Sequence, residues 1–291
     1  MVPPAIVFFE SLLPYGLTCL GCHAVLWVIF RYVLPSSGPW HAAPNFTAHQ
    51  TIALFLMIQW TWNGFFGEDD EEDMNVGTNS LPVILRPSSL GMKMARRSMA
   101  ALWIWDIPVS MLSSDMSSAM DALMHAHHLG MLLVTCIVMG WLTFGTASEN
   151  YPNPVGATLA PLFFGQVELS SIPLQIVDLF HPKKSAAWHE YMLSRPMLVS
   201  INDACRQLFA LLFLAVRGIY FPFLVFTIVI PEFWDALGWT MMEDQTKYVL
   251  PIVTILTFSV AFTLLQMYWA VLVVNQIYKA LKGGGDKKKT G

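Results

Sequence analysis

Long apolar runs, separated by polar or turn-rich segments, dominate the pattern along this chain. A membrane-spanning helix needs about 20 mainly apolar residues, and about seven stretches reach or approach that length. The third stretch is the shortest and carries Asp106 and Pro108. The stretches are residues 14–34, 48–66, 98–114, 122–145, 156–179, 207–230 and 248–276. The pattern predicts an all-α, polytopic membrane protein with about seven transmembrane helices.

The segments between the runs are rich in charges and turn residues. Residues 68–73 read EDDEED, which is typical of a solvated loop, and residues 150–154 read NYPNP, a turn cluster. A longer loop with basic residues is expected over 181–206. The chain then divides into an N-terminal transmembrane helix and loop over residues 1–47, a main domain over 48–279 and a basic tail over 280–291.

Composition supports the membrane class. Apolar residues make up 55% of the chain and charged residues 12%, against about 25% charged in an average soluble domain. The mean hydropathy is +0.52. These values exclude a soluble enzyme and a disordered chain, and four cysteines in 291 residues give no disulfide framework. The net charge of −4 indicates no basic face for nucleic acid.

Loop charges predict the orientation in the membrane, because Lys and Arg favour the cytosolic side. The loops on the side of the N-terminus hold five such residues, and the other side holds ten. We expect a lumenal or extracellular N-terminus and a cytosolic C-terminus. The chain ends in KKTG, which resembles a dilysine signal for retrieval to the endoplasmic reticulum by coat proteins. The glycosylation sequon at Asn45 falls in a loop placed in the cytosol, so no glycan is expected there.

Ionisable side chains lie inside several apolar runs, where they are costly and mark function by default. Depths estimated at about 1.5 Å per residue place them in two tiers of the cytosolic half. The outer tier holds His127, His128, Asp178 and Asp203, and the inner tier holds Asp106, Glu168 and Arg217. This grouping predicts one polar cavity that opens toward the cytosol.

The two tiers predict different chemistry. Arg217 stays charged and needs a carboxylate, for which Glu168 or Asp106 is the natural partner. The HAHH segment, which includes His125, offers imidazoles that accept a proton near neutral pH or carry an acyl group briefly. A nearby Asp could orient such a ring. The alternatives are a structural ion pair and histidines that hold helices together by hydrogen bonds.

Three short stretches resemble the TLC-domain family, which includes ceramide synthases and translocating-chain-associating membrane proteins. They are DALMHAHHLG at 121–130, ELSSIP at 168–173 and QLFALLFLAVRGIYFP at 207–222. The resemblance implies a barrel of six helices plus an extra N-terminal helix, with a lipid-binding interior. It also implies acyl transfer to a sphingoid base, or control of phospholipid composition or traffic. The sequence departs from ceramide synthases, since GQVELSSIP at 165–173 lacks their further Asp residues. The branch outside typical ceramide synthases is therefore favoured.

Rival sites are weaker. CLGCH at 19–23 has the form of a haem-attachment motif but lies inside an apolar run. A di-iron hydroxylase or desaturase would need several histidine clusters. The other histidines form no such cluster with HAHH, and a single cluster cannot hold two irons. A transporter remains a third, weaker class, since ionisable groups in spans also mark ion paths.

The first hypothesis is an acyltransferase of the endoplasmic-reticulum membrane that acts on membrane lipids. His127 and His128 act as base or acyl carrier, and Asp178 or Asp203 orients them. The remaining candidates, Asp106, His125, Glu168 and Arg217, hold the cavity or bind the polar head of the substrate. No cofactor or metal is expected, acyl-CoA is a candidate substrate, and a homo-oligomer stays open. The second hypothesis is a non-catalytic lipid-binding or trafficking protein.

Overall fold

The structure, a computed structural model, describes residues 4–69, 81–113, 119–138 and 155–287, and every regular element in these ranges is a helix. Three described helices are long and apolar enough to cross a membrane, namely Leu12–Val33, Pro196–Met242 and Thr246–Lys279. The all-helical, membrane-embedded class is confirmed. The other predicted stretches are helical as well, but they are shorter, less apolar or interrupted.

The N-terminal part forms three helices. α1 (Pro4–Val28) continues through a π-helical turn at Ile29–Val33. α2 (Pro39–Ala42) and α3 (Pro44–Phe66) each begin on a proline, whose fixed φ and missing N–H suit the first helical position. The sequon lies in the first turn of α3 rather than in a loop, and Thr47 is buried there with its hydroxyl accepting a hydrogen bond from Trp188 Nε1 at 2.8 Å.

The third predicted stretch belongs to a longer helix. α5 (Ser89–Ala100) passes through a π-helical segment at Ala101–Asp106 into α6 (Ile107–Ser113). Its start is fixed by a cap, because the Ser88 hydroxyl accepts from the Gly91 N–H and the Asp69 carboxylate accepts from the Leu90 N–H. Lys93, Arg96 and Arg97, three of the five basic residues assigned above to loops on the side of the N-terminus, therefore lie on α5.

The predicted stretch at 156–179 is broken rather than continuous. It consists of short helical pieces, with α8 at Ala160–Phe164 and α9 at Ser171–Leu179 joined by a 3₁₀ segment at Gln166–Ser170. The break coincides with a close backbone contact, because a Cβ on Gly165 would lie 2.6 Å from the Cα of Gly64 on α3. Before it, α7 spans Ala119–Val138.

One long helix replaces much of the loop expected over 181–206. After α10 (Ala186–Leu193), α11 (Pro196–Leu212) runs through α12 (Phe221–Leu224) into α13 (Ile230–Met242). Asn202, Asp203 and Arg206 therefore lie on a helix. The whole run has 47 residues, about 70 Å, more than twice the ~30 Å of the hydrocarbon core. The last helix, α14 (Val249–Lys287), extends into the segment expected as a tail.

Prolines explain the π-helical segments of these long helices. A proline inside a helix removes an N–H and its ring crowds the carbonyl four residues earlier. The segments Ala101–Asp106, Phe213–Tyr220 and Val225–Val229 contain the residues four before Pro108, Pro222 and Pro231. Asp106 and Arg217 both lie within such a segment, so the disturbance falls where the predicted charged groups are.

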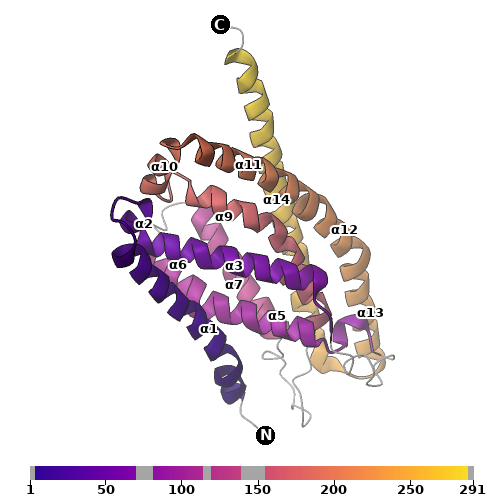
Figure 1. Ribbon diagram of the computed structural model, residues 1–291. Coiled ribbons are helices and arrows are strands. Elements are labelled where there is room, and N and C mark those ends of the chain that lie inside the picture. The colour runs from indigo at the N-terminus through magenta and orange to yellow at the C-terminus, as the bar shows by residue number, and fades with distance from the viewer. Residues whose placement is uncertain (1–3, 70–80, 114–118, 139–154, 288–291) are drawn as a thin grey trace.

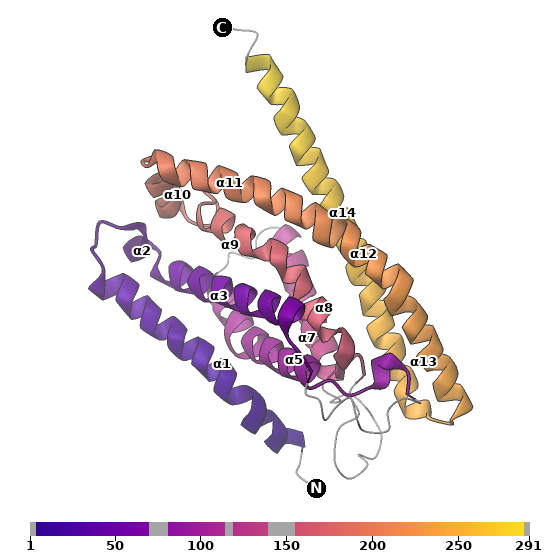
Figure 2. The same ribbon diagram turned by 45° about the vertical axis from the view of Figure 1, so that its right-hand side comes forward.

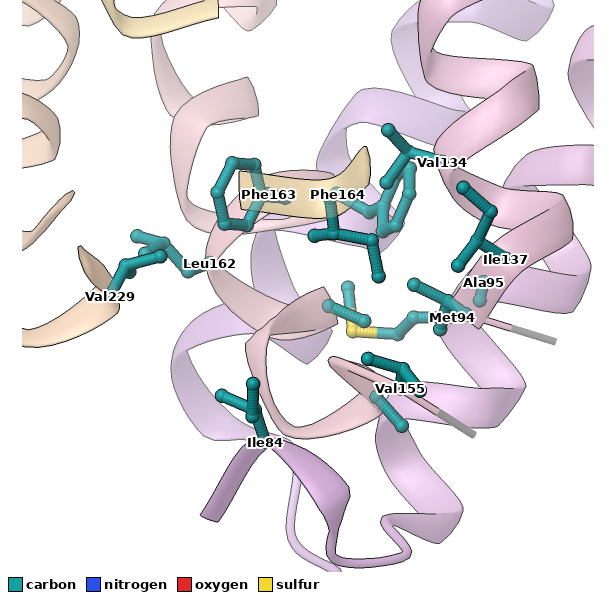
Figure 3. Packing of buried hydrophobic residues seen from close by; sticks show 14 of the residues in the cluster. Ile84, Met94, Ala95, Val134, Ile137, Val155, Leu162, Phe163, Phe164 and Val229 are labelled. Carbon is teal, nitrogen blue, oxygen red and sulfur yellow. The ribbon is translucent and has the colours of Figure 1, made fainter. Parts of the chain in front are cut away.

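The helical segments close into a ring. In the described part of the chain, contacts run in cyclic order from α3 to α5–α6, α7, α14, the α11–α13 helix, the α8–α9 segment and back to α3. α1 packs on the outside, against α3 and α5–α6 (Figures 1 and 2). Toward the end of the ring where α13 meets α14, buried apolar side chains of α5, α7 and α8 fill the interior, including Met94, Ile137 and Phe163 (Figure 3).

We expect the close backbone contact of Gly64 with Gly165 to contribute to the stability of the fold. Gly165→Ala forces two backbones apart, and we expect a loss of roughly 1–3 kcal/mol of stability, as for overpacked sites. Thermal unfolding of the purified protein in detergent measures it. Gly238→Ala is the control, because a Cβ there meets nothing within 4 Å and alanine favours the helix by about 1 kcal/mol. Equal unfolding temperatures for the two variants would contradict the expectation.

Candidate functional site

Two histidines share the carboxylate of Asp106. His49 Nε2, from α3, lies 2.9 Å from Asp106 Oδ1, and His128 Nδ1, from α7, lies 3.0 Å from Oδ2. The side chain of Asp106 is 14% exposed, while that of His128 keeps 28% exposure. The carboxylate is thus enclosed between two rings, and the His128 ring remains reachable.

The carboxylate of Asp106 favours a proton on His128 Nδ1, since the two groups lie at ion-pair distance although not in hydrogen-bond geometry. A carboxylate only accepts hydrogen bonds, so the ring nitrogen facing it carries the proton. In neutral His128 this favours the tautomer with the proton on Nδ1 and the lone pair on Nε2. A ring oriented by a carboxylate on one nitrogen and free on the other is the arrangement of a general base.

Aromatic rings of α14 pack against His127. Its ring lies parallel to Phe262 at 5.1 Å between centroids, and edge-on to Trp269 at 5.9 Å, both on α14. The His128 ring is 5.7 Å away. The two adjacent histidines therefore face different surroundings, which suits them to different roles.

Arg217 is the centre of a second set of contacts. Its side chain is buried, and it donates to Glu168 Oε2 at 3.2 Å, to Ser171 Oγ at 2.8 Å and to the Val167 carbonyl at 3.0 Å. The Gln266 amide oxygen on α14 lies 3.5 Å from the same guanidinium. The pairing of Arg217 with a carboxylate is confirmed, and the partner is Glu168.

These contacts form one polar cluster inside the ring. The His127 ring lies 5.7 Å from that of His128 and stacks on Phe262 of α14, the helix that also carries Gln266. Each of the helical segments in cyclic order contributes at least one member. The polar cluster consists of His49, Asp106, His127, His128, Glu168, Arg217 and Gln266.

The expected outer tier does not form around the histidines. Asp178, at the end of α9, accepts a hydrogen bond from Lys184 Nζ at 2.6 Å, and Asp203 is exposed on α11. The carboxylate beside His128 is Asp106 instead. The side chain of His125 lies outside the described part of the chain. Sequence reasoning missed His49 and Gln266, although both are polar residues within apolar stretches.

An apolar pocket begins at His127. It has a volume of about 210 Å³ and lies between α7, α8 and α14, with Phe163 and Phe262 in its wall. Along α7 it extends from Ala126 to Val138, about 18 Å at the rise of a helix. The site thus combines a narrow apolar space with polar groups at one end.

The described residues contain no group of three or more His, Cys, Asp or Glu side chains arranged to hold a metal ion. Comparison of the chain with protein-family models, curated proteins and solved structures gives no match. The functional assignment therefore depends on the geometry of the site.

Breaking the buried ion pair should cost more than breaking an exposed one. Glu168→Gln leaves the Arg217 charge without its carboxylate, and we expect a loss of about 3 kcal/mol. Lys184→Ala removes the more exposed pair with Asp178, for which less than ~1 kcal/mol is expected. Unfolding of both variants in detergent, of Arg217→Gln, and of Glu168→Gln combined with Arg217→Gln measures the coupling. Purely additive losses in the double variant would contradict a direct interaction.

Proposed function

We propose that the protein is a multi-pass membrane enzyme of the endoplasmic reticulum that transfers an acyl group to an amine or hydroxyl of a membrane lipid. The carrying observation is that the Asp106 carboxylate lies 3.0 Å from His128 Nδ1, on the side of the ring away from Nε2, beside an apolar pocket that begins at His127. A base and a place for an apolar chain are the two requirements of acyl transfer within a membrane.

The dimensions of the pocket support a fatty acyl chain. One leaflet occupies half of the ~30 Å hydrocarbon core, so a chain of one leaflet spans about 15 Å. The pocket extends about 18 Å along α7. Its wall includes Gly130, Phe163 and Phe258, and each buried methylene contributes about 0.8 kcal/mol to binding. The acyl carbonyl would then lie near the histidines.

The polar cluster supplies the remaining roles. His128 Nε2 takes the proton of the attacking amine or hydroxyl as its heteroatom adds to the acyl carbonyl. The bond to the leaving thiol or alcohol then breaks, and the same proton passes to that group. Gln266 Nε2 and Trp269 Nε1 are buried donors without an acceptor among the described residues, so they are available to polar atoms of the substrate.

The ring of helices with α1 outside supports the resemblance to TLC-domain proteins, in which six helices form the barrel. Orientation with the C-terminus in the cytosol fits acyl-CoA as donor, because a water-soluble thioester would reach the site from that side. The terminal KKTG fits retrieval to the endoplasmic reticulum, and it lies in residues that the structure leaves undescribed. Membrane lipids are the proposed acceptors.

A non-catalytic lipid-binding protein is the second candidate. One observation favours it, because the Arg217 guanidinium is occupied by Glu168, Ser171 and Val167 and leaves little capacity for a substrate head group. In that case the pocket holds a lipid chain without chemistry.

The role of His128 separates the two candidates. His128→Gln removes the free Nε2 base, and we expect product formation to fall about 10²–10⁴-fold. The measurement uses protein in nanodiscs, long-chain acyl-CoA, and sphingoid base or lysophospholipid, with products identified by mass spectrometry. His41→Gln, at a half-buried site on α2 outside the polar cluster, is the control. Bound lipid in wild-type protein without product would support the lipid-binding candidate and contradict the enzyme.

The pocket should also set the length of the bound chain. Val134→Phe places a ring halfway along the pocket wall, and we expect preference to move to shorter chains, with about fourfold weaker binding per methylene excluded. A series of fatty acids of increasing length, titrated into wild type and variant, measures the change. Leu129→Phe is the control, because Leu129 on α7 is 57% exposed and does not line the pocket. An unchanged length preference in Val134→Phe would reject the pocket as the chain site.

A further inference from the structure

Two further histidines lie next to the proposed catalytic pair and have no role in the scheme above. His49 donates from Nε2 to Asp106 Oδ1 at 2.9 Å, while the other carboxylate oxygen faces His128. His23, on α1, is the histidine of the CLGCH segment and is buried. Both connect to Trp105, which immediately precedes Asp106 in the chain.

The position of the His49 ring is fixed by stacking. It lies on the indole of Trp105 with centroids 4.9 Å apart and an angle of 21° between the planes. Trp105 itself is only 2% exposed. Stacking fixes the plane of the His49 ring, and Nε2 is the ring atom that faces Asp106 Oδ1 within that plane.

Helix α1 fixes Trp105 in turn. Trp105 Nε1 donates to His23 Nδ1 at 3.3 Å, and an indole N–H only donates, so His23 Nδ1 accepts. The proton of neutral His23 is then on Nε2, which lies 2.7 Å from Asn45 Oδ1, an acceptor. Every donor in this chain of contacts meets an acceptor, and each ring has one defined tautomer.

We propose that His49 is a positioning residue for the His128 base, acting through Asp106. By donating to Oδ1 it holds the carboxylate so that Oδ2 faces His128 Nδ1, which keeps His128 in the tautomer with Nε2 free. Through His23 and Trp105, α1 belongs to the site although it lies outside the ring of helices. The kinetic part of this inference rests on the proposed acyl transfer, whereas the tautomer does not.

The shared carboxylate explains why one histidine controls the other. If the His49 donor is lost, Oδ1 becomes a buried acceptor without a partner. Without that bond the carboxylate is free to turn, and Oδ2 leaves its place 3.0 Å from His128 Nδ1. A ring without a fixed partner populates both tautomers, and in one of them Nε2 carries the proton and cannot act as a base.

Nitrogen-15 NMR of histidine-labelled protein in nanodiscs tests the tautomers, with signals assigned by single His→Gln variants. In the wild type we expect the proton of His49 on Nε2 and that of His128 on Nδ1. His49→Phe keeps the ring on Trp105 but has no donor, and we expect His128 to show both tautomers. His49→Gln places an amide N–H where Nε2 was, and should restore the single Nδ1–H form. His41→Phe is the control.

Kinetics give the second arm. We expect His49→Phe to lower kcat roughly 10–100-fold, as for groups that orient a catalytic residue, with KM unchanged and His49→Gln near wild type. A wild-type His49 protonated on Nδ1, or a His49→Phe variant with His128 still wholly Nδ1–H, overturns the proposal. If the tautomers behave as expected but the wild type forms no product, the proposed acyl transfer fails and the positioning role stands.

Discussion

The structure depends on the enclosure of ionisable groups among apolar helices. A charge inside a membrane protein persists only with partners, because the hydrocarbon offers none. Here Asp106 has His49 and His128, and Arg217 has Glu168, Ser171 and the Val167 carbonyl. These partners come from different helices, so satisfying each charge also fixes which helices are neighbours. The polar cluster and the closed ring are two consequences of one requirement.

That requirement explains what the sequence could predict. Apolar runs gave the helical, membrane-embedded class, and ionisable residues within the runs pointed to Asp106, His128, Glu168 and Arg217 before any contact was known. The pairing of Arg217 with Glu168 follows from the same reasoning, because a buried guanidinium needs a carboxylate. Such predictions succeed because they depend on the cost of burial and not on the exact course of the chain.

The pairing of His128 could not be predicted, because it depends on helix boundaries and on rotation about helix axes. Depth counted from the ends of apolar runs placed Asp178 and Asp203 near the histidines, yet α11 begins at Pro196 and carries Asp203 to an exposed face. The break at Gly165 likewise invalidates a depth counted along residues 156–179, because that stretch is not one continuous helix. His49 was overlooked because it stands alone in its run, and only the packing of α3 against α5–α6 brings it to Asp106.

The π-helical segments bear on how such a site tolerates change. A π turn holds one residue more than an α turn, and each residue of a helix rotates the next by about 100°. Removing a single residue from Phe213–Tyr220 would leave the apolar run as hydrophobic and nearly as long, so insertion into the bilayer would continue. Everything beyond the missing residue would nevertheless swing by more than a quarter turn. The fold therefore tolerates a change of composition in these short intervals more readily than a change of length.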